Sequence, residues 1–291
     1  MPQVCWLGPE QSEGNRPRPK EPASQECRTP SPKKSYPAPF KTFMIPYFFA
    51  TTVHLGPVPI QVWGFFVALG IMVGARVAAR QAEKKGFLPG AVWDIAGWML
   101  PAAFVGARLF HVFVYLPNYY LLRPAEWLAV WDGGFSFIGG LAAAILTGIW
   151  FLKKKKFDAW AYADLLAYGT AIGYAIGRIG CFLIHDHPGI QTSFFLGVRY
   201  PDGVVRHDLG FYEILNGLGL AILLFVLQKK EQRPGISAAV ALAWYGVVRF
   251  FLDFFRIGDA RYFFITPAQW ISLAMAVAGI ALLVRLRKSS E

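Results

Sequence analysis

Arginine side chains stand inside apolar stretches of this sequence, where a charge is costly to bury. Arg178 occurs in GRIGC and Arg249 in YGVVRFFLDFFR, and Arg108 and Arg256 have similarly apolar neighbours. Such residues mark a functional site by default, and the structural alternative is an ion pair with an internal carboxylate. Asp253 follows Arg249 by four residues, so we expect these two side chains to pair on one helical face. Because a guanidinium donates two parallel hydrogen bonds to phosphate, the four arginines together predict a site for a phospholipid headgroup.

Three histidines that follow Arg178 are candidates for proton transfer. His185 and His187 stand on either side of Asp186, and His207 lies near the end of the same polar segment. An imidazole changes its charge near neutral pH, which suits a general acid or base. We therefore expect one of these histidines to carry a catalytic proton transfer, with Asp186 as its orienting partner.

The cysteines predict neither a disulfide framework nor a metal site. Cys5 and Cys27 lie in the N-terminal tail, and Cys181 lies in an apolar run. Cys181, His185 and His187 imitate a metal-binding set, but no second pair of ligands accompanies them. We expect no metal.

The composition is that of a membrane protein. The chain has 291 residues, of which 55% are hydrophobic and 16% charged, and its mean hydropathy is +0.39. A soluble domain carries a charged share nearer about a quarter. The formal net charge of +11 would suggest nucleic acid as the partner of a soluble protein. Here the lysines lie in short segments between apolar runs, so we interpret them as orientation signals and contacts with anionic lipids, and we expect no nucleic-acid binding.

Apolar runs recur at the length that crosses a bilayer, about 20 residues. We predict an all-α membrane protein with about seven transmembrane helices. The predicted spans cover residues 60–81, 92–116, 135–152, 160–184, 209–227, 236–256 and 267–285. Basic residues gather in alternate connections, at 84–85, 153–156, 229–233 and 285–288. The positive-inside rule then places the C-terminus in the cytoplasm, the start of the first span outside, and the buried arginines in the outer halves of their spans.

Residues 1–43 differ from the rest of the chain. They are rich in Pro, Ser, Lys and Arg and hold no apolar run, which favours a disordered extension. On the predicted topology these basic residues would have to cross the membrane. We therefore expect the mature chain to begin near Met44, so that residues 44–291 form one transmembrane domain.

Two outward-facing stretches are expected to have structure of their own. Residues 117–134 place Trp127, Val130 and Trp131 on one helical face, which is typical of an interfacial helix. Residues 185–208 form the longest polar segment and carry Pro-Gly turn signals. We predict that this second stretch forms a small hairpin-like head in the periplasm.

Six blocks of this sequence resemble the bacterial prolipoprotein diacylglyceryl transferase family. They are HLGPVPIQVWGF at 54–65, GARL at 106–109, VWDGGFSFIGG at 130–140, GRIGCF at 177–182, RHDLGFYE at 206–213 and YGVVRFFLDFFR at 245–256. Each motif alone is weak, but the ordered set and the matching number of spans are specific. The resemblance covers residues 44–285.

The resemblance implies a reaction at the inner membrane of a bacterium. The family transfers the diacylglyceryl group of phosphatidylglycerol to the thiol of a prolipoprotein's lipobox cysteine, and glycerol-1-phosphate leaves. No cofactor is expected. Fixed cations would stabilise the charge on the departing phosphate, and a base would take the thiol proton because the thiolate is the nucleophile.

Residue by residue, Arg178 matches the arginine of the family block GRxGNF, Arg249 that of YGxxR and Arg108 that of GxR. His207 and Glu213 match the histidine and glutamate of HPxQLYE. The predicted catalytic residues are Arg178, Arg249, His207, His185 and His187. The predicted substrate-binding residues are Arg108, Arg256, Glu213, Asp253, Gly139 and Gly140. The alternative, purely structural role of the two glycines is to allow close packing of helices.

The sequence departs from the family at its proposed base. The family block SFHGG reads SFIGG here, so Ile138 replaces a histidine, and Cys181 replaces the asparagine of GRxGNF. Because isoleucine accepts no proton, another group must do so, or the reaction has changed. The alternatives are a phospholipid-dependent transferase with another acceptor and a non-catalytic lipid-binding membrane protein. The retained buried charges favour catalysis.

Overall fold

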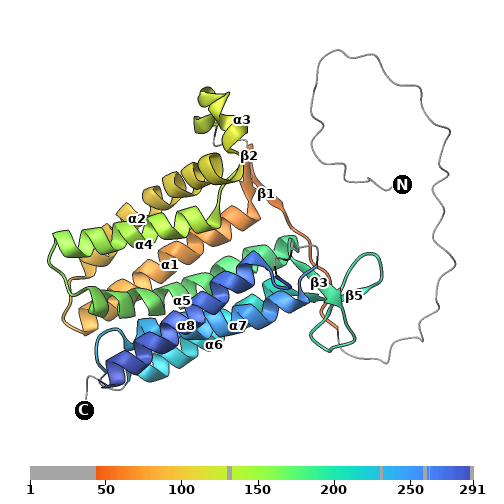
Figure 1. The fold of residues 1–291 in the computed structure, drawn as a ribbon. Helices are drawn as coiled ribbons and strands as arrows, with labels where there is room; N and C mark the ends of the chain where they lie inside the picture. Colours follow the sequence, from red (N-terminus) through yellow and green to blue (C-terminus); the bar gives the residue numbers. More distant parts are fainter. Residues whose placement is uncertain (1–43, 130–132, 230–231, 258–260, 262, 289–291) are drawn as a thin grey trace, which may run out of the picture. The chain divides into compact units, whose positions relative to one another are not determined.

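The computed structural model describes residues 44–291 except 130–132, 230–231, 258–260, 262 and 289–291. The tail of residues 1–43 lies outside the described residues, and so does the prediction about it. The helices are α1 (Val62–Lys84), α2 (Pro89–Phe110), η1 (His111–Tyr115), α3 (Pro117–Leu121), η2 (Pro124–Leu128), α4 (Phe137–Lys154), α5 (Ala159–Ile184), α6 (Leu209–Gln228), α7 (Ile236–Leu252), η4 (Asp253–Phe255) and α8 (Pro267–Lys288), shown in Figure 1. The strands are β1 (Thr52–Leu55), β2 (Val58–Gln61), β3 (Pro188–Gln191), β4 (Val198–Arg199) and β5 (Val205–Asp208).

Among the described residues, six helices are long and apolar enough to cross a membrane. They are α1, α2 with η1, α5, α6, α7 with η4, and α8. The prediction of an all-α, multi-pass membrane protein is thereby confirmed. The predicted span 135–152 corresponds to α4, an 18-residue helix that is not among these six, so a count of seven stays a prediction.

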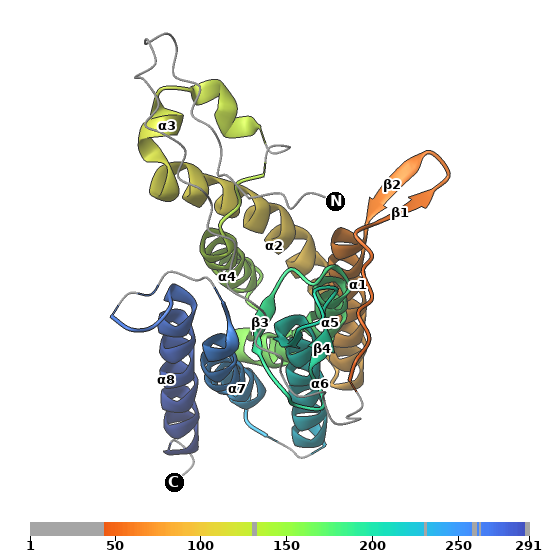
Figure 2. The ribbon, with the colours of Figure 1, turned by 90° about the vertical axis from the view of Figure 1, so that its right-hand side faces the viewer.

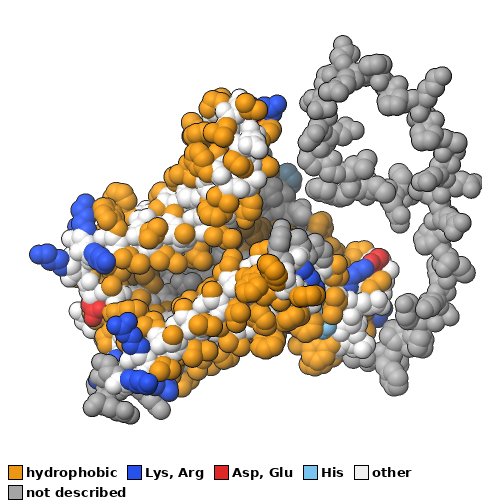
Figure 3. Space-filling view, viewed as in Figure 1, with side chains coloured by type: hydrophobic (Ala, Val, Ile, Leu, Met, Phe, Trp, Pro, Cys, Tyr) orange, Lys and Arg blue, Asp and Glu red, His pale blue; other side chains and the backbone are white. Residues whose placement is uncertain are grey.

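The helix ends follow local sequence signals. Asp158 caps α5 by accepting hydrogen bonds from the backbone N–H groups of Trp160 and Ala161 at 3.0 and 3.2 Å. Basic residues occupy the last turns of α1, α4 and α8, where they complement the helix dipole. Figure 3 shows Lys and Arg side chains gathered where these helices end. The basic connections therefore share one end of the helices, as the predicted topology requires.

The polar segment 185–208 lies at the other end of the helices. It contains three strands in the order β3-β5-β4, both pairs antiparallel, instead of a single hairpin. Figure 2 shows these strands in front of the ends of α5 and α6. Asp208 ends β5 and also caps α6 through the N–H of Phe211, and Gly189 of β3 pairs with Arg256 after α7. The small sheet therefore connects the ends of three helices.

The prediction of a single interfacial helix in residues 117–134 is wrong. The stretch forms two short helical segments, α3 and η2, because Pro124 cannot continue the first of them. Trp127 lies in η2 and donates a hydrogen bond from Nε1 to the carbonyl of Tyr120 at 2.8 Å. Val130 and Trp131 lie outside the described residues.

Glycines let α1 and α5 approach each other closely. Gly70 and Gly74 of α1 face Gly173 and Gly169 of α5, and a Cβ added to Gly70 would lie 2.3 Å from the carbonyl oxygen of Gly173. The spacing is the small-xxx-small pattern that permits close backbone contact in membranes. The same feature joins α2 to α4, where Gly139 faces Gly106. Packing therefore accounts for these glycines.

We expect Gly70→Ala to destabilise the protein by about 1–3 kcal/mol, because a backbone carbonyl must move to admit the methyl group. Gly64→Ala is the matched control on the same helix, since nothing closer than 4.0 Å meets its added Cβ. That variant should be neutral or gain up to about 1 kcal/mol from helix propensity. Thermal unfolding in detergent compares the two, and equal midpoints would contradict the packing argument.

Candidate active site

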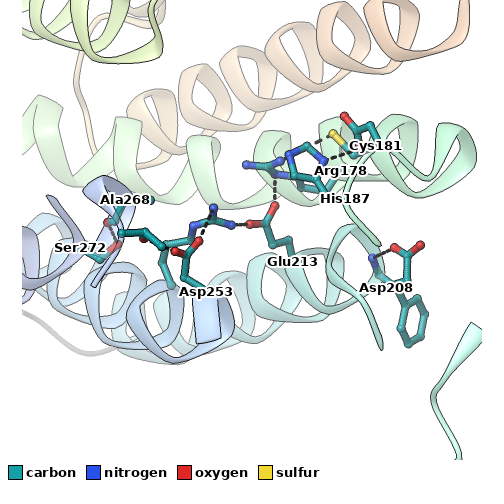
Figure 4. A network of polar contacts seen from close by, with 12 residues as sticks. Arg178, Cys181, His187, Asp208, Glu213, Asp253, Ala268 and Ser272 are labelled. Atoms are coloured by element: carbon teal, nitrogen blue, oxygen red, sulfur yellow. Dashed lines mark hydrogen bonds and ion pairs between the residues drawn. The ribbon is translucent and has the colours of Figure 1, made fainter. Parts of the chain in front are cut away.

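Arg178 and Arg249 come together on one carboxylate. Arg178, near the end of α5, donates from Nε to Oε2 of Glu213 at 2.6 Å, and Arg249, near the end of α7, donates from Nη1 to Oε1 of the same residue. Glu213 lies near the start of α6, and only 1% of it is exposed. Figure 4 shows the carboxylate between the two guanidiniums. Residues far apart in the sequence thus form one buried network, and the matched family positions of Arg178, Glu213 and Arg249 are neighbours in space.

Asp253 extends the network to α8. Its Oδ1 accepts a hydrogen bond from Nη2 of Arg249 at 3.1 Å, as the four-residue spacing predicts. Its Oδ2 accepts from the hydroxyl of Thr266. Thr266 and Gln269 form a capping box at the start of α8, with hydrogen bonds of 2.9 and 3.1 Å between them. The Thr-x-x-Gln spacing before an apolar run is the signal that identifies this cap, which we had not predicted.

The charges of this network are balanced within the protein. Two guanidiniums meet two carboxylates, so the arginines expected to bind phosphate are first held by protein groups. The Arg178 side chain is 24% exposed and that of Arg249 is 10% exposed. Nη2 of Arg178 makes no hydrogen bond to any described residue. Arg178 is therefore the member of the pair best placed to bind an anionic ligand, and Arg249 fixes the carboxylate that orients it.

Two tyrosines border the arginine pair. The guanidinium of Arg178 lies 5.0 Å from the ring centre of Tyr174, and Tyr245 meets Tyr174 edge to face at 5.6 Å. The hydroxyl of Tyr174 is buried and has no hydrogen-bond partner among the described residues. The Tyr245 side chain is the polar group that interacts with this hydroxyl, so the two tyrosines border the arginines together. The position of Tyr174, four residues before Arg178 on the same helical face, is the signal that sequence reasoning missed.

Of the three predicted histidines, His187 lies beside Arg178. Both residues are close to Cys181: Nη1 of Arg178 is 3.6 Å from Sγ, and a ring nitrogen of His187 lies within 4.8 Å of it (Figure 4). Nδ1 of His187 contacts Oδ1 of Asp186, so the expected orienting partner is in place. The side chains of His187 and Asp186 are both partly exposed. An imidazole with a carboxylate partner therefore stands next to the guanidinium network.

His185 lies in a different environment. Its Nδ1 contacts Oδ2 of Asp208 at 2.6 Å, and both side chains are only 1% exposed. Tyr47 stacks on the imidazole at 4.2 Å, and the hydroxyl of Tyr200 donates to the same carboxylate oxygen at 2.9 Å. Burial and the nearby Asp208 raise the pKa of Tyr200 far above its ordinary value, so Tyr200 stays protonated and remains a donor. This pair holds the small sheet against the helix ends, and among the described residues it does not contact Arg178.

His207 also lies away from the arginine pair. It belongs to β5, contacts the hydroxyl of Tyr212 through Nδ1 at 2.6 Å and packs on the ring of Phe255 at 4.7 Å. Burial lowers the pKa of His207 below its ordinary value of 6.5, so the imidazole is neutral at neutral pH. Its role in proton transfer stays a prediction that no contact with Arg178 or Glu213 supports within the described chain.

Arg108 makes contacts of a structural kind. It is 6% exposed and donates to four backbone carbonyls, those of Glu126, Trp127, Gly133 and Gly134, at 2.6–3.2 Å. A guanidinium has five N–H donors, so these bonds occupy most of its capacity. Arg108 therefore anchors the segment before α4, and its predicted contact with substrate gains no support from this geometry.

The remaining predicted binding residues lie at different places. Gly139 and Gly140 lie in the first turn of α4 and face Phe110, Gly106 and Ala103 of α2, so close packing explains them. Arg256 is half-buried after η4, where its backbone pairs with Gly189. A substrate contact of Gly139, Gly140 or Arg256 stays a prediction.

Several known proteins similar to this chain carry the same description. The family model described as prolipoprotein diacylglyceryl transferase matches residues 50–285. A protein of Bacillus cytotoxicus named phosphatidylglycerol--prolipoprotein diacylglyceryl transferase is 31% identical over 258 residues, which cover 85% of this chain and 95% of that protein. Proteins of the same name from Bacillus cereus and Bacillus anthracis are 29% identical over the same shares of both chains.

Proposed function

The chain belongs to the prolipoprotein diacylglyceryl transferase family, and we propose that Arg178, Glu213 and Arg249 form the centre of its reaction. The chain is a multi-pass membrane transferase. It moves the diacylglyceryl group of phosphatidylglycerol to a prolipoprotein. The observation that carries the assignment of the centre is the single buried carboxylate shared by two arginines from separate helices.

The reaction needs a cation at the phosphate that leaves. As the sulfur of the acceptor attacks the glycerol carbon, the bond from that carbon to the phosphate oxygen breaks and negative charge collects on the oxygen. A guanidinium already fixed in a site of low dielectric stabilises this charge without reorganisation. Arg178 is held by Glu213 through Nε, and its Nη2 remains available for the phosphate. Arg249 and Asp253 position the carboxylate and do not need to touch the lipid.

The acceptor thiol must lose its proton, because the thiolate is the nucleophile. We assign this ionisation to the Asp186–His187 pair. This pair is partly exposed. Cys181 lies between it and Arg178, since its Sγ is near both Nη1 of Arg178 and the ligand atoms of the pair. A histidine held by a carboxylate has the arrangement of an oriented base. This pair takes over the role that the resemblance gives to the histidine replaced by Ile138. The acceptor is then the lipobox cysteine of a prolipoprotein, and glycerol-1-phosphate is the leaving product.

The orientation in the membrane follows from the same site. We propose that the helix ends carrying Arg178, Glu213 and Arg249 face the periplasm of a bacterial inner membrane, with the sheet of residues 185–208 as a periplasmic head and the C-terminus in the cytoplasm. The basic connections at the opposite end of the helices support this orientation. Residues 44–291 then form one transferase domain.

The function is tested with purified protein, phosphatidylglycerol vesicles and a synthetic lipobox peptide. Mass spectrometry should find the peptide carrying a diacylglyceryl thioether, together with an equal amount of glycerol-1-phosphate. Release of glycerol-1-phosphate without modified peptide would point to another acceptor. Binding of phosphatidylglycerol without either product would support the lipid-binding alternative and contradict catalysis.

In this assay, His187→Ala should lower the rate of transfer by roughly 10²–10⁴-fold, the range for loss of a positioned acid–base group. His54→Ala is the matched control, because His54 is exposed on β1 and belongs to no polar network described above. Its rate should stay unchanged. A His187→Ala protein with the parent's rate would remove the Asp186–His187 pair from the mechanism and leave the arginine centre untouched.

A further inference from the structure

Cys181, Asp186 and His187 form a compact group of metal-binding side chains. Each offers one ligand atom, and the three atoms lie within 4.8 Å of one another. Cys181 is buried in the last turn of α5, whereas Asp186 and His187 keep access to solvent just before β3. This set differs from the one considered in the sequence, Cys181, His185 and His187. Asp186 takes the place of His185, because His185 is paired with Asp208.

This donor set matches one metal in particular. Zinc binds thiolate, imidazole and carboxylate, and sites with three protein ligands keep a fourth tetrahedral position open. Ligand atoms of a tetrahedral zinc ion lie about 3.3–3.8 Å apart, as bond lengths of about 2.0–2.3 Å require. The side chains of Asp186 and His187 contact each other through Oδ1 and Nδ1 and are 32% and 23% exposed, so rotation of both away from this contact would close the group around an ion.

We propose that Cys181, Asp186 and His187 bind a Zn²⁺ ion whose open position takes the acceptor thiol. The proposal rests on the proposed function and deepens it, since the Asp186–His187 pair, which is assigned there to the ionisation of the thiol, would act by holding the ion together with Cys181. A thiol that coordinates zinc is deprotonated outright. The ion therefore supplies what the SFIGG block lacks, where Ile138 offers no proton acceptor.

The neighbourhood of the group suits this role. Nη1 of Arg178 lies 3.6 Å from Sγ of Cys181, so a cationic donor contacts the ligand sulfur. The same arginine reaches Glu213 at 2.6 Å and is the residue assigned to the leaving phosphate. The thiol and the phosphate would therefore be held by adjacent groups, as attack on one carbon atom requires.

The step is balanced in atoms and charge. The acceptor thiol binds zinc through sulfur and releases its proton to water. The zinc-bound sulfur attacks the glycerol carbon, so that a carbon–sulfur bond forms while the bond from carbon to the phosphate oxygen breaks. The electron pair of the broken bond stays on glycerol-1-phosphate. The product is a neutral thioether, a weaker ligand than thiolate, which frees the open position for the next acceptor.

The site is tested by zinc binding to the full chain in detergent. Because Cys5 and Cys27 are additional thiols, all proteins carry Cys5→Ser and Cys27→Ser. After dialysis against Zn²⁺, mass spectrometry of metals should find about one zinc per chain in this background. Cys181→Ser, Asp186→Asn and His187→Ala should each weaken binding by more than roughly 100-fold, since loss of even an outer partner costs 10–100-fold.

With Co²⁺ in place of Zn²⁺, a thiolate-to-cobalt charge-transfer band should appear and should vanish in Cys181→Ser. His54→Ala should bind as the background does.

Activity measurements separate this inference from the proposed function. Removal of zinc by a chelator should abolish thioether formation, and added Zn²⁺ should restore it. Transfer at full rate in metal-free protein would overturn the inference and leave the proposed function standing. Zinc binding that is insensitive to Cys181→Ser and His187→Ala would also overturn it. One zinc per chain at these residues, with no transfer under any condition, would support the metal site and count against the proposed function.

Discussion

Glu213→Gln is expected to destabilise the protein by about 3–5 kcal/mol and to abolish measurable transfer. The carboxylate accepts hydrogen bonds from both Arg178 and Arg249, and its side chain is 2% exposed. Removing one partner of a buried ion pair leaves an uncompensated charge, and here two guanidiniums lose their common partner while one keeps Asp253. Because the free Nη2 of Arg178 depends on Glu213 for its direction, the loss of activity should persist below the unfolding temperature. Thermal or denaturant unfolding in detergent and the peptide assay measure the two effects.

Glu126→Gln is the matched control for this substitution. Glu126 pairs with Arg123 at 3.8 Å, and the two side chains are 42% and 55% exposed. An exposed pair of this kind contributes at most about 1 kcal/mol. The same chemical change should therefore leave both stability and transfer close to those of the parent. A Glu213→Gln protein as stable as Glu126→Gln would show that the two arginines do not depend on a shared carboxylate.

The charges of the site could be found from the sequence because membranes make them conspicuous. Arg178 and Arg249 stand out in apolar runs, and the four-residue spacing of Arg249 and Asp253 gives their pairing directly. The direct partner of both arginines, Glu213, entered only through the family resemblance. It lies 35 residues after Arg178 and 36 before Arg249, and no local pattern links side chains at such distances.

The positions of the histidines relative to the site could not be predicted from the sequence. The sequence groups His185 with His187, yet the backbone at His185 turns to a φ of 47° at the end of α5. That left-handed residue sends the chain away from the helix, so His185 packs among aromatic rings with Asp208 while His187 lies near Arg178 and Cys181. Neighbours in a sequence separate in space wherever a helix ends, and only the fold decides which of them joins the site.

Arg178→Lys should lower kcat/KM by roughly 10²–10³-fold, the cost of removing one fixed donor from a developing oxyanion. Lysine keeps the charge but has no planar fork, so it cannot bind Glu213 through one nitrogen and a phosphate through another. If Nη2 of Arg178 meets the phosphate mainly in the transition state, kcat should fall while KM for phosphatidylglycerol changes little. A rise in KM alone would place the contact in the ground state and give Arg178 a binding role instead.

Arg123→Lys makes the same exchange at the exposed pair with Glu126 and should leave kcat/KM within about 2-fold of the parent, because exposed pairs contribute little. Arg249→Lys provides the second comparison. Arg249 meets two carboxylates and is less exposed than Arg178, so its substitution should cost stability as well as activity. We expect Arg178→Lys to lose more kcat and Arg249→Lys to lose more stability. This pattern would separate the residue at the phosphate, Arg178, from the residue that positions it, Arg249. The reverse pattern would exchange the two roles, and equal losses of both kinds would mean that the network acts as one unit in which neither arginine alone faces the lipid.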